Sequence, residues 1–405
     1  MYRIVAQCLP QRRVLLRSLE GIPTNPPQGV LSSYSLNAIS DDHRQARWHK
    51  AISNAEKIVG TSHSTFTEKL LTSETGVGAA SHLRKLLNTT HPVIKTITNL
   101  TQHGQNTLQT RGLVVLLLSR CAGHIEGSPQ VLNEEFEEAC VYGVTQRQKS
   151  MAEIVEMVYT SHLIHRDVLN VSRELITDPS LLNELQYGNK IAILVGDILI
   201  ANASKMTAEL NDCKVLELIA TSIGDFMKSE FVVRHDSFGK PYPPPCMDLN
   251  AWENRIFLNT GSLLAHACQS AVIMGGHGGA VQRRAKEFGR SLGFAWQLHD
   301  ELEPFVNLLG QPNGTPFDLT SFPVMLHLQR NPHIYAALET SALETHDANR
   351  IDYADLYTQI LSSGVVEEAR QQLHTYVDVC LGNIEGFDQC YRAKQALGDV
   401  IIALK

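Results

Sequence analysis

The stretch from Ala152 to Asn170 constrains the fold most, because it combines helical periodicity with an unusual polar end. Its apolar residues recur at helical spacing, without interruption by Pro or Gly: Met151, Ile154, Val155 and Val158. Its carboxyl end gathers polar side chains: His162, His165, Arg166, Asp167 and Asn170. On a helix, Asp167 and Asn170 share a face, as metal-binding carboxylates would. The stretch therefore predicts an amphipathic helix whose polar end is placed like a metal site, but carries one carboxylate beside one arginine.

Helical periodicity continues through most of the remaining chain, and convincing period-two strands are missing. With 405 residues, 43% of them hydrophobic, the chain can bury a large core. Helices are expected to include residues 83–87, 94–100, 113–118, 215–231 and 252–274. Short breaks are expected at residues 123–129, 241–245 and 275–279, and a loop is expected around residues 304–323. These patterns predict one all-α domain over residues 46–405.

The composition excludes several classes of protein. The 35 basic and 42 acidic residues give a net charge of −7, so no global basic field indicates a nucleic-acid partner. The eight cysteines form no C-x-x-C pair, which argues against a zinc ribbon and suits a reducing compartment. No apolar run reaches the ~18–20 residues that cross a bilayer. The nearest, residues 191–203, contains Asp197 and is predicted to be a buried core helix.

The N-terminus has the composition of a targeting segment. Its first nineteen residues hold four arginines and no acid, and the first acidic residue is Glu20. Arg-rich, acid-poor and amphipathic segments are typical of mitochondrial transit peptides. We therefore expect residues 1–40 to be a transit peptide with a disordered tail, rather than part of the fold. An ordinary disordered basic tail is the alternative.

Three segments together resemble the trans-polyprenyl diphosphate synthases of the isoprenoid synthase superfamily. GNKIAILVGDILIANA, residues 188–203, resembles a helix of that family almost position for position. The end of the 152–170 stretch is similar to the family's first aspartate-rich motif, H-D-D-x-x-D. GRSLGFAWQLHDELEPF, residues 289–305, is similar to its second motif, Q-x-x-D-D-x-x-D. The resemblance covers roughly residues 46–405 and implies a helical bundle around a central cavity.

The resemblance also implies a chemistry. In that family an allylic diphosphate ionises when Mg²⁺ ions, held by carboxylates on two facing helices, neutralise the leaving diphosphate. Lys and Arg side chains hold the second substrate, isopentenyl diphosphate. The growing chain then extends between apolar helices.

The residues at these motif positions depart from the family pattern. The first motif reads Arg166, Asp167 and Asn170, so a guanidinium that repels Mg²⁺ replaces the leading acid. The second reads Asp300, Glu301 and Pro304, so its third acid is lost. We expect no intact catalytic residue here. Asp167, Asp300 and Glu301 are the metal candidates, and the alternative is a salt-bridged remnant in which Arg166 neutralises Asp300 or Glu301.

The cations of the family are missing as well. In LQTRG, residues 108–112, only Arg111 remains of a Lys-Arg-Arg set. Asn259 replaces the Lys of a Lys-Thr pair, and the stretch at residues 318–323 lacks the late Lys. Gln297 of the second motif is kept, so Arg111 and Gln297 are the candidates for residual diphosphate binding. Arg111 could equally form a surface or interface ion pair.

Two further polar residues have structural alternatives to a ligand role. His165 occupies the family's histidine position before the acids, so we expect it to be hydrogen-bonded rather than to bind zinc. Asp197 would be costly to bury unpaired in its apolar helix. We therefore expect a satisfied structural role for Asp197.

This combination of kept apolar helices and lost charged groups resembles the second-subunit group of the family. Members of that group pair with a catalytic subunit, as a heterodimer or heterotetramer, to make the ubiquinone tail in mitochondria. The resemblance implies a non-catalytic or regulatory subunit, Mg²⁺ held by the partner, and a matrix location with a contact to the inner membrane left open. The alternatives are a stand-alone prenyltransferase with an unusual substrate and a partnerless prenyl-chain-binding protein.

Overall fold

The computed structural model describes a helical protein over residues 46–60, 91–93, 110–125, 143–169, 171, 176, 178–235, 241–242, 248–306, 316–344 and 351–405. Its long helices are α6 (Thr110–Ala122), α8 (Gln146–Arg166), α9 (Pro179–Glu209), α10 (Cys213–Val232), α12 (Ser262–Met274), α13 (Gly279–Val306) and α17 (Val365–Ile384). Shorter ones are α11 (Leu249–Ile256), the π-turn η2 (Phe257–Gly261), α14 (Phe322–Arg330), α15 (Pro332–Glu344), α16 (Tyr353–Ser362) and α18 (Tyr391–Ile402), preceded along the chain by a helix at residues 46–59. Within the described chain, β1 (Arg234–His235) and β2 (Pro241–Tyr242) pair in an antiparallel hairpin.

The helix starts follow from local sequence signals. Thr145 begins α8 with a capping box, in which its side chain accepts from the Gln148 backbone N–H and Gln148 reaches back. Asp178 caps α9 ahead of Pro179, whose fixed φ suits the first helical turn. Asp212 caps α10 in the same way, by accepting backbone N–H bonds. These caps satisfy donors that a helix start otherwise leaves unpaired.

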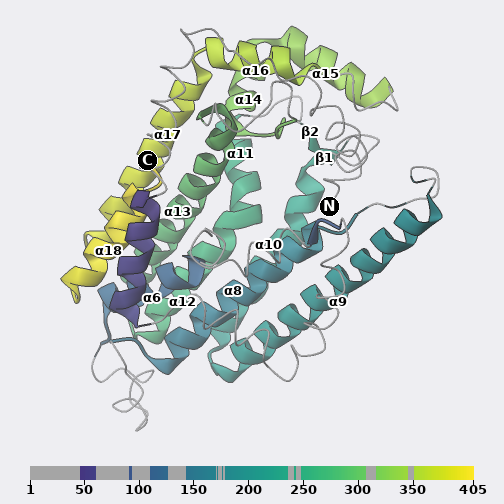
Figure 1. Cartoon of the computed structure of the whole chain (residues 1–405). Coiled ribbons are helices and arrows are strands. Elements are labelled where there is room, and N and C mark those ends of the chain that lie inside the picture. The colour runs from purple at the N-terminus through teal and green to yellow at the C-terminus, as the bar shows by residue number, and fades with distance from the viewer. Residues whose placement is uncertain are drawn as a thin grey trace.

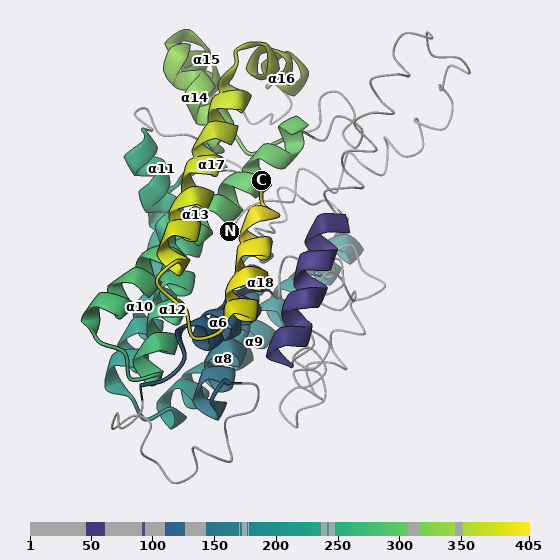
Figure 2. The same ribbon diagram turned by 90° about the vertical axis from the view of Figure 1, so that its left-hand side faces the viewer.

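The helices stack around two central members. α13 contacts α12 on one side and α17 on the other, while α8 lies between α6 and α9 (Figure 1). The C-terminal helix α18 lies against α6, close to the helix at residues 46–59 (Figure 2). α9 and α10 form a helical hairpin at the edge of the bundle, and α9 lies along its outside (Figure 1).

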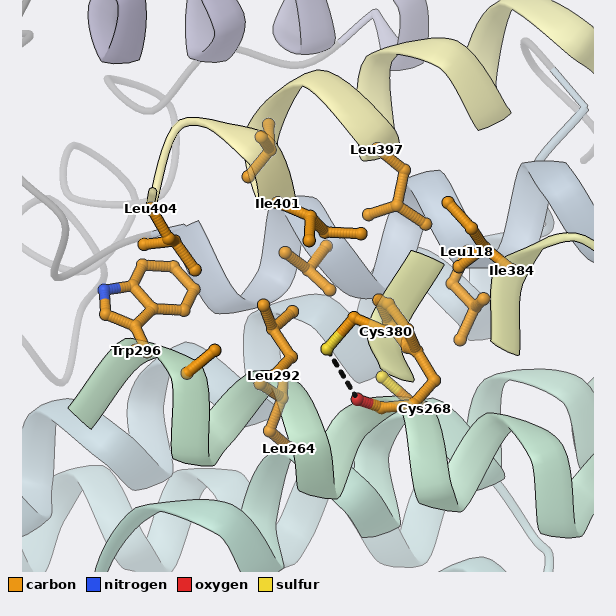
Figure 3. Close-up of a cluster of buried hydrophobic side chains, with 14 of the residues drawn as sticks. Leu118, Leu264, Cys268, Leu292, Trp296, Cys380, Ile384, Leu397, Ile401 and Leu404 are labelled. Carbon is orange, nitrogen blue, oxygen red and sulfur yellow. Dashed lines mark hydrogen bonds between the residues drawn. The ribbon is translucent and has the colours of Figure 1, made fainter. Parts of the chain in front are cut away.

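The largest hydrophobic cluster joins helices from both ends of the chain. Figure 3 shows Leu118 of α6, Leu264 of α12 and Leu292 of α13 converging with Cys380 of α17 and Leu397 of α18. Each of these side chains is buried. The C-terminal helices α17 and α18 therefore form part of the core.

Glycines allow α12 and α13 to approach closely. A Cβ at Gly289 of α13 would lie 2.5 Å from the Leu264 backbone oxygen of α12. A Cβ at Gly293, one turn further on, would lie 2.7 Å from the Cα of Gly261. Both distances are too short for real atoms, so this contact depends on glycine at 289 and 293.

Most predicted helices are confirmed. α10, α12 with η2 and α11, and the described part of α6 cover the predicted ranges 215–231, 252–274 and 113–118. The break at residues 275–278 separates α12 from α13, as predicted. The predicted helices at 83–87 and 94–100 lie outside the described residues, as does the predicted transit peptide.

Three expectations about helices were wrong. α8 ends at Arg166 rather than at Asn170, because Asp167 adopts the C-cap conformation. Pro304 lies inside α13 rather than in a loop, in the last turn before Val306. The 191–203 segment is not a buried core helix, because α9 is buried on one side only and exposes Ile193 and Leu194.

Two helices in the described chain are long and apolar enough to cross a membrane by length and composition alone. The continuous helix at residues 249–274 is 78% buried inside the protein over its most apolar window, whereas α9 is 33% buried there. The helix at residues 249–274 is therefore a core helix, whereas α9 presents an apolar surface to solvent.

Replacing Gly289 by Ala should destabilise the fold, because its new methyl group meets backbone atoms of α12 that cannot rotate away. We expect the free energy of unfolding to fall by about 1–3 kcal/mol, measured by urea denaturation. The matched control is Gly382→Ala in α17, where a Cβ meets nothing within 4 Å. That change should stabilise the helix by about 0.5–1 kcal/mol, and equal losses in both variants would contradict the close-contact argument.

Candidate functional site

Arg111 connects the two motif-bearing helices. Its guanidinium carbon lies 3.3 Å from the centre of the Tyr159 ring on α8 and 5.2 Å from that of the Trp296 ring on α13. The side chain is 6% exposed, so this stacking takes place inside the protein. A guanidinium between two rings gains cation–π attraction while it is shielded from water. Arg111 therefore fixes the separation of α8 and α13 near the motifs.

The amino end of α6, where Arg111 lies, is capped from α8. The Gly112 backbone N–H donates to Glu156 Oε1 over 2.6 Å, which places a carboxylate at the positive end of the helix dipole. Burial raises the pKa of Glu156 to about 7, and the Gly112 hydrogen bond and the Arg111 charge oppose that rise. Glu156 is thus a positioning group for Arg111.

Glu301 is the centre of a buried hydrogen-bond network. Oε2 accepts from Trp252 Nε1 of α11 at 3.0 Å and from the Phe322 backbone N–H of α14 at 2.8 Å. Oε1 accepts from Gln297 Nε2 at 2.9 Å and lies 3.5 Å from the Arg255 guanidinium. Burial raises the pKa of Glu301, and the Arg255 charge opposes that rise. Both oxygens are therefore committed to protein donors.

Two of the predicted site residues, Gln297 and Glu301, belong to this network. Gln297, a candidate for residual diphosphate binding, donates its amide to Glu301 one turn further along α13. Arg255 also donates to the Thr320 carbonyl at 2.8 Å, so it ties α11 to the segment before α14. The network joins three helices, and each of its members is oriented by another.

Asp300 differs from its neighbour because its side chain is exposed. Crowding by protein atoms raises its pKa, and the Arg111 charge opposes that rise. Arg166 is half-buried and, among the described residues, forms no ion pair with Asp300 or Glu301. The expected pairing of Arg166 with either acid is therefore wrong. Arg255 takes that role for Glu301.

The first motif lies at the C-terminal end of α8. Asp167 is the C-cap, and its backbone N–H bonds back to the carbonyls of His165 and Ile164. Asn170 lies outside the described residues, so its relation to Asp167 remains a prediction. The backbone just before it is clamped by Asn189 of α9, which accepts from the Leu169 N–H and donates to the Leu169 carbonyl, both at 2.7 Å. α9 therefore holds the motif segment in place.

His165, near the end of α8, also packs against α9. Its Nε2 is 3.3 Å from the Ile193 carbonyl and 3.4 Å from Asp197 Oδ1. Gly196 makes room for the ring, because a Cβ there would lie 2.2 Å from Nε2. His165 is thus hydrogen-bonded, as predicted. Asp197 is exposed, so the expected cost of burying it does not arise.

His162 faces the other way, into the protein. Its Nε2 lies 3.0 Å from Asn259 Oδ1, and its ring stacks on Phe226 of α10 with centroids 4.1 Å apart. Burial lowers the pKa of His162 to about 3, and the Arg166 charge lowers it further, whereas the Asn259 bond opposes both. Asn259 occurs within the π-turn η2, a geometry that often aims a side chain into a site.

These residues do not fit a Mg²⁺ cluster. Mg²⁺ requires several oxygen ligands in near-octahedral geometry. In the described chain, Glu301 has both oxygens in protein hydrogen bonds, a guanidinium occupies position 166, and Pro304 offers no ligand. Asp167 and Asp300 remain as carboxylates without the rest of a set.

Reasoning from the sequence missed the partners that define the site. Trp252 and Arg255, which hold Glu301, lie in a short helix outside the quoted motifs. Asn189 lies within the GNK segment of the family resemblance, but the sequence does not indicate its hydrogen bonds with Leu169. The one available signal was a tryptophan in a chain with three, because a buried indole needs an acceptor.

Comparison with known proteins identifies relatives over most of the chain. The family description "Polyprenyl synthetase" matches residues 94–355. The human All trans-polyprenyl-diphosphate synthase PDSS2 is 33% identical over 89% of this chain and 88% of its own length. The Neurospora crassa protein named Probable hexaprenyl pyrophosphate synthase, mitochondrial, is 24% identical over 94% of this chain and 92% of its own.

Solved structures share the architecture. A polyprenyl synthase from Caulobacter crescentus, complexed with calcium and isoprenyl diphosphate, superposes with a TM-score of 0.57 at 20% identity, over 83% of this chain and 96% of that one. A decaprenyl diphosphate synthase from Rhodobacter capsulatus gives a TM-score of 0.56 at 18% identity, over 84% and 98%. The predicted all-α isoprenoid synthase fold is confirmed.

Replacing Glu301 by Ala should destabilise the protein, because it removes the counter-charge of Arg255 and leaves a buried indole N–H and a backbone N–H without their acceptor. We expect a loss of about 3–5 kcal/mol in the free energy of unfolding, measured by urea denaturation. Glu303→Ala is the control, since Glu303 is exposed in the same helix and its loss should cost less than about 0.5 kcal/mol. Similar losses in both variants would contradict the network's importance.

The stability contributed by His162 should depend on pH. Between its unfolded pKa of 6.5 and its folded pKa of about 3, the unfolded state binds the extra proton, so this contribution is complete above pH 6.5 and is lost on acidification. The difference in unfolding free energy between wild type and His162→Gln should shrink by about 2 kcal/mol from pH 7 to pH 5. Urea denaturation at several pH values measures it, and parallel pH profiles would contradict it.

Proposed function

This chain belongs to the polyprenyl synthetase family, and on that basis we propose that it is the non-catalytic subunit of a heteromeric all-trans polyprenyl diphosphate synthase. The complex is a prenyltransferase that makes the isoprenoid side chain of ubiquinone. A catalytic subunit of the same family supplies the chemistry, and this chain alone is inactive. The resemblance to PDSS2 over most of both chains supports this assignment.

The proposal rests mainly on the hydrogen bonds that both carboxylate oxygens of Glu301 accept. An acid that binds Mg²⁺ must present free oxygens to the metal. Both Glu301 oxygens accept hydrogen bonds from buried donors of α11, α13 and α14. Freeing them would leave those donors unsatisfied inside the protein, which is costly. Glu301 is therefore a structural acid at a motif position.

The side chains that would hold diphosphates also have partners inside the protein. Arg111 is stacked on Tyr159, and Gln297 donates to Glu301. Asn259, at the position of a family lysine, is paired with His162. Ionisation of an allylic diphosphate needs cations at the leaving oxygens, but Asn259 and Gln297 carry no charge and the Arg111 guanidinium is held between rings. Mg²⁺ in the assembled enzyme is therefore assigned to the partner subunit.

The partner is proposed to bind the exposed side of the α9–α10 hairpin, which we name the hairpin face. Its exposed apolar side chains are Tyr187, Ile193, Leu194, Ile198, Leu216, Met227 and Phe231. Exposed apolar side chains gathered on one part of a surface mark sites of association. Asp197 lies among them with its side chain 64% exposed, which suits a protein partner offering a cation better than a lipid interior.

A charge at the centre of two identical faces disfavours self-association. In an isologous dimer the same patch meets itself, so residues near the symmetry axis face their own copies. An axis near the middle of α9 would bring Asp197 close to its copy and Lys190 close to Lys205. A different subunit avoids this repulsion, which favours a heteromer of two or four chains.

The location proposed is the mitochondrial matrix, with the transit peptide in residues 1–40. Two fungal relatives carry the word mitochondrial in their names, which supports this location. A polyprenyl product is apolar enough to enter a bilayer, so the complex would act beside the inner membrane.

Co-expression with the catalytic subunit tests the function. We expect prenyl chain synthesis from labelled isopentenyl diphosphate and an allylic primer with Mg²⁺ only when both subunits are present. Asp300→Ala in this chain should leave activity within about twofold, because an isolated carboxylate without its set contributes little to metal binding. The corresponding acid in the partner is the matched control and should be essential.

Product from this chain alone would establish the stand-alone prenyltransferase instead, with Asp300 as part of a working site. A bound prenyl chain in the absence of a partner and of turnover would favour the partnerless binding protein. Both outcomes are read from the same preparations by extracting the products and the bound lipid.

A charge on the hairpin face should separate the subunits. Leu194→Glu places a carboxylate at a position 47% exposed in the isolated chain, and its burial against a partner would cost several kcal/mol unless it were paired. We expect at least a tenfold loss of co-purified partner with unchanged helical content. Val379→Glu, on α17 and 40% exposed, is the matched control and should retain the partner. Equal retention by both variants would remove the hairpin face from the interface.

A further inference from the structure

One helical turn inward from each motif, a buried ring occupies the interior. His162 precedes Arg166 by four residues on α8, and Trp296 precedes Asp300 by four residues on α13. Residues four apart share one face of a helix. Both rings are almost fully buried, at 4% and 3% exposure. A prenyl chain whose diphosphate lay at the motifs would have to pass these rings to enter the bundle.

The first layer of this region is a cation between two rings. Arg111 lies 3.3 Å from the Tyr159 ring centre and 5.2 Å from that of Trp296, so it spans the interval between α8 and α13. The Gly112–Glu156 hydrogen bond fixes the start of α6 and holds Arg111 there. The rings of Trp48 and Trp296 pack edge to face, with ring centres 5.7 Å apart.

The second layer closes the interval between α8, α10 and η2. The His162 ring lies nearly parallel to Phe226, 10° from coplanar, with centroids 4.1 Å apart, and its Nε2 meets Asn259. Nothing can enter between rings at that separation without parting them. Ser161 ties the same turn of α8 to α9 by donating to the Gly196 carbonyl at 2.8 Å.

A third, independent set of polar contacts joins α10 to α12. Ser262 donates to Asp225 Oδ2 at 2.6 Å, and His266 Nδ1 is hydrogen-bonded with Ser222 at 2.9 Å. All four side chains are buried. They occupy an interface that would need to be apolar and separable to line a hydrocarbon chain.

A polyprenyl chain cannot satisfy any of these groups. Its entry would break the Arg111 stacking, part the His162–Phe226 rings, and leave Asn259 against hydrocarbon without a partner. Each buried polar group that loses its partner carries a free-energy cost, and entry of the chain would break several such contacts at once together with the ring stacking. These contacts therefore favour the protein without a prenyl chain in its interior.

We propose that the interior of this subunit beneath its two motif positions is closed to the growing prenyl chain. The catalytic partner alone then houses the chain, and the cavity of that partner alone sets product length. This inference rests on the proposed function, because it concerns the division of labour within the heteromeric enzyme. It assigns His162, Phe226, Asn259 and Arg111 a structural role in this closure.

Photolabelling of the intact complex tests this. A farnesyl diphosphate with a benzophenone on its terminal isoprene unit would be turned over by the co-purified wild-type subunits and then irradiated. Labelled peptides would be mapped by mass spectrometry. We expect at least tenfold more label on the partner than on α8, α10 or α12 of this chain. Comparable labelling of these helices would overturn the proposal.

Product length provides a second readout. His162→Phe and Phe226→Tyr keep a ring at each position, so the interior stays closed, and they should leave the product distribution of the complex unchanged by even one isoprene unit. A shift of one unit or more would overturn the proposal, since it would place the chain against these rings. Phe288→Tyr, at a fully buried position on α13 away from this region, controls for a general disturbance of the core. If a variant fails to assemble, the wild-type labelling decides.

The two proposals fail separately. Turnover by this chain alone would refute the non-catalytic assignment whatever the labelling pattern. Activity confined to the pair, with label on α8 or α10 of this chain, would refute only the closure.

Discussion

The buried carboxylate of Glu301 holds the motif end of the molecule together. It accepts from α11 through Trp252, from α14 through the Phe322 backbone and from its own helix through Gln297, while Arg255 balances its charge. A buried charge is tolerated only when hydrogen bonds and a counter-charge replace water. The mutual arrangement of these helices therefore depends on this acid, and so does the position of Asp300 beside it.

Other candidate site residues also bind partners inside the protein. Arg111 is stacked between rings, Asn259 is paired with His162, and His165 is held against α9. An intramolecular partner is present at all times, so it outcompetes a dissolved ligand unless the ligand binds very tightly. A site assembled from such pairs keeps the shape of a synthase while its polar groups bind one another. Family membership and the non-catalytic role that we propose are therefore compatible in one chain.

The interior beneath the motifs and the hairpin face at the edge of the bundle differ in how their apolar side chains are covered. The interior beneath the motifs is filled by stacked rings and paired polar groups, whereas the hairpin face carries Ile193 and Leu194 toward solvent. Apolar surface that a chain cannot bury alone favours association, because covering it releases ordered water. Both features agree with the proposed function, in which this chain supports a partner rather than holds a substrate.

The sequence by itself determined the helices, since periodicity and caps such as Asp212 are local properties. It also determined the family, because motif spacing is preserved when single residues change. Only the tertiary structure decided what the motif residues do. Glu301 could not be assigned to a network from its neighbours, because Trp252 and Phe322 reach it from distant helices. Nor could the apolar run of α9 reveal its exposed side, since a helix that faces a partner and one that faces a core share the same residue types.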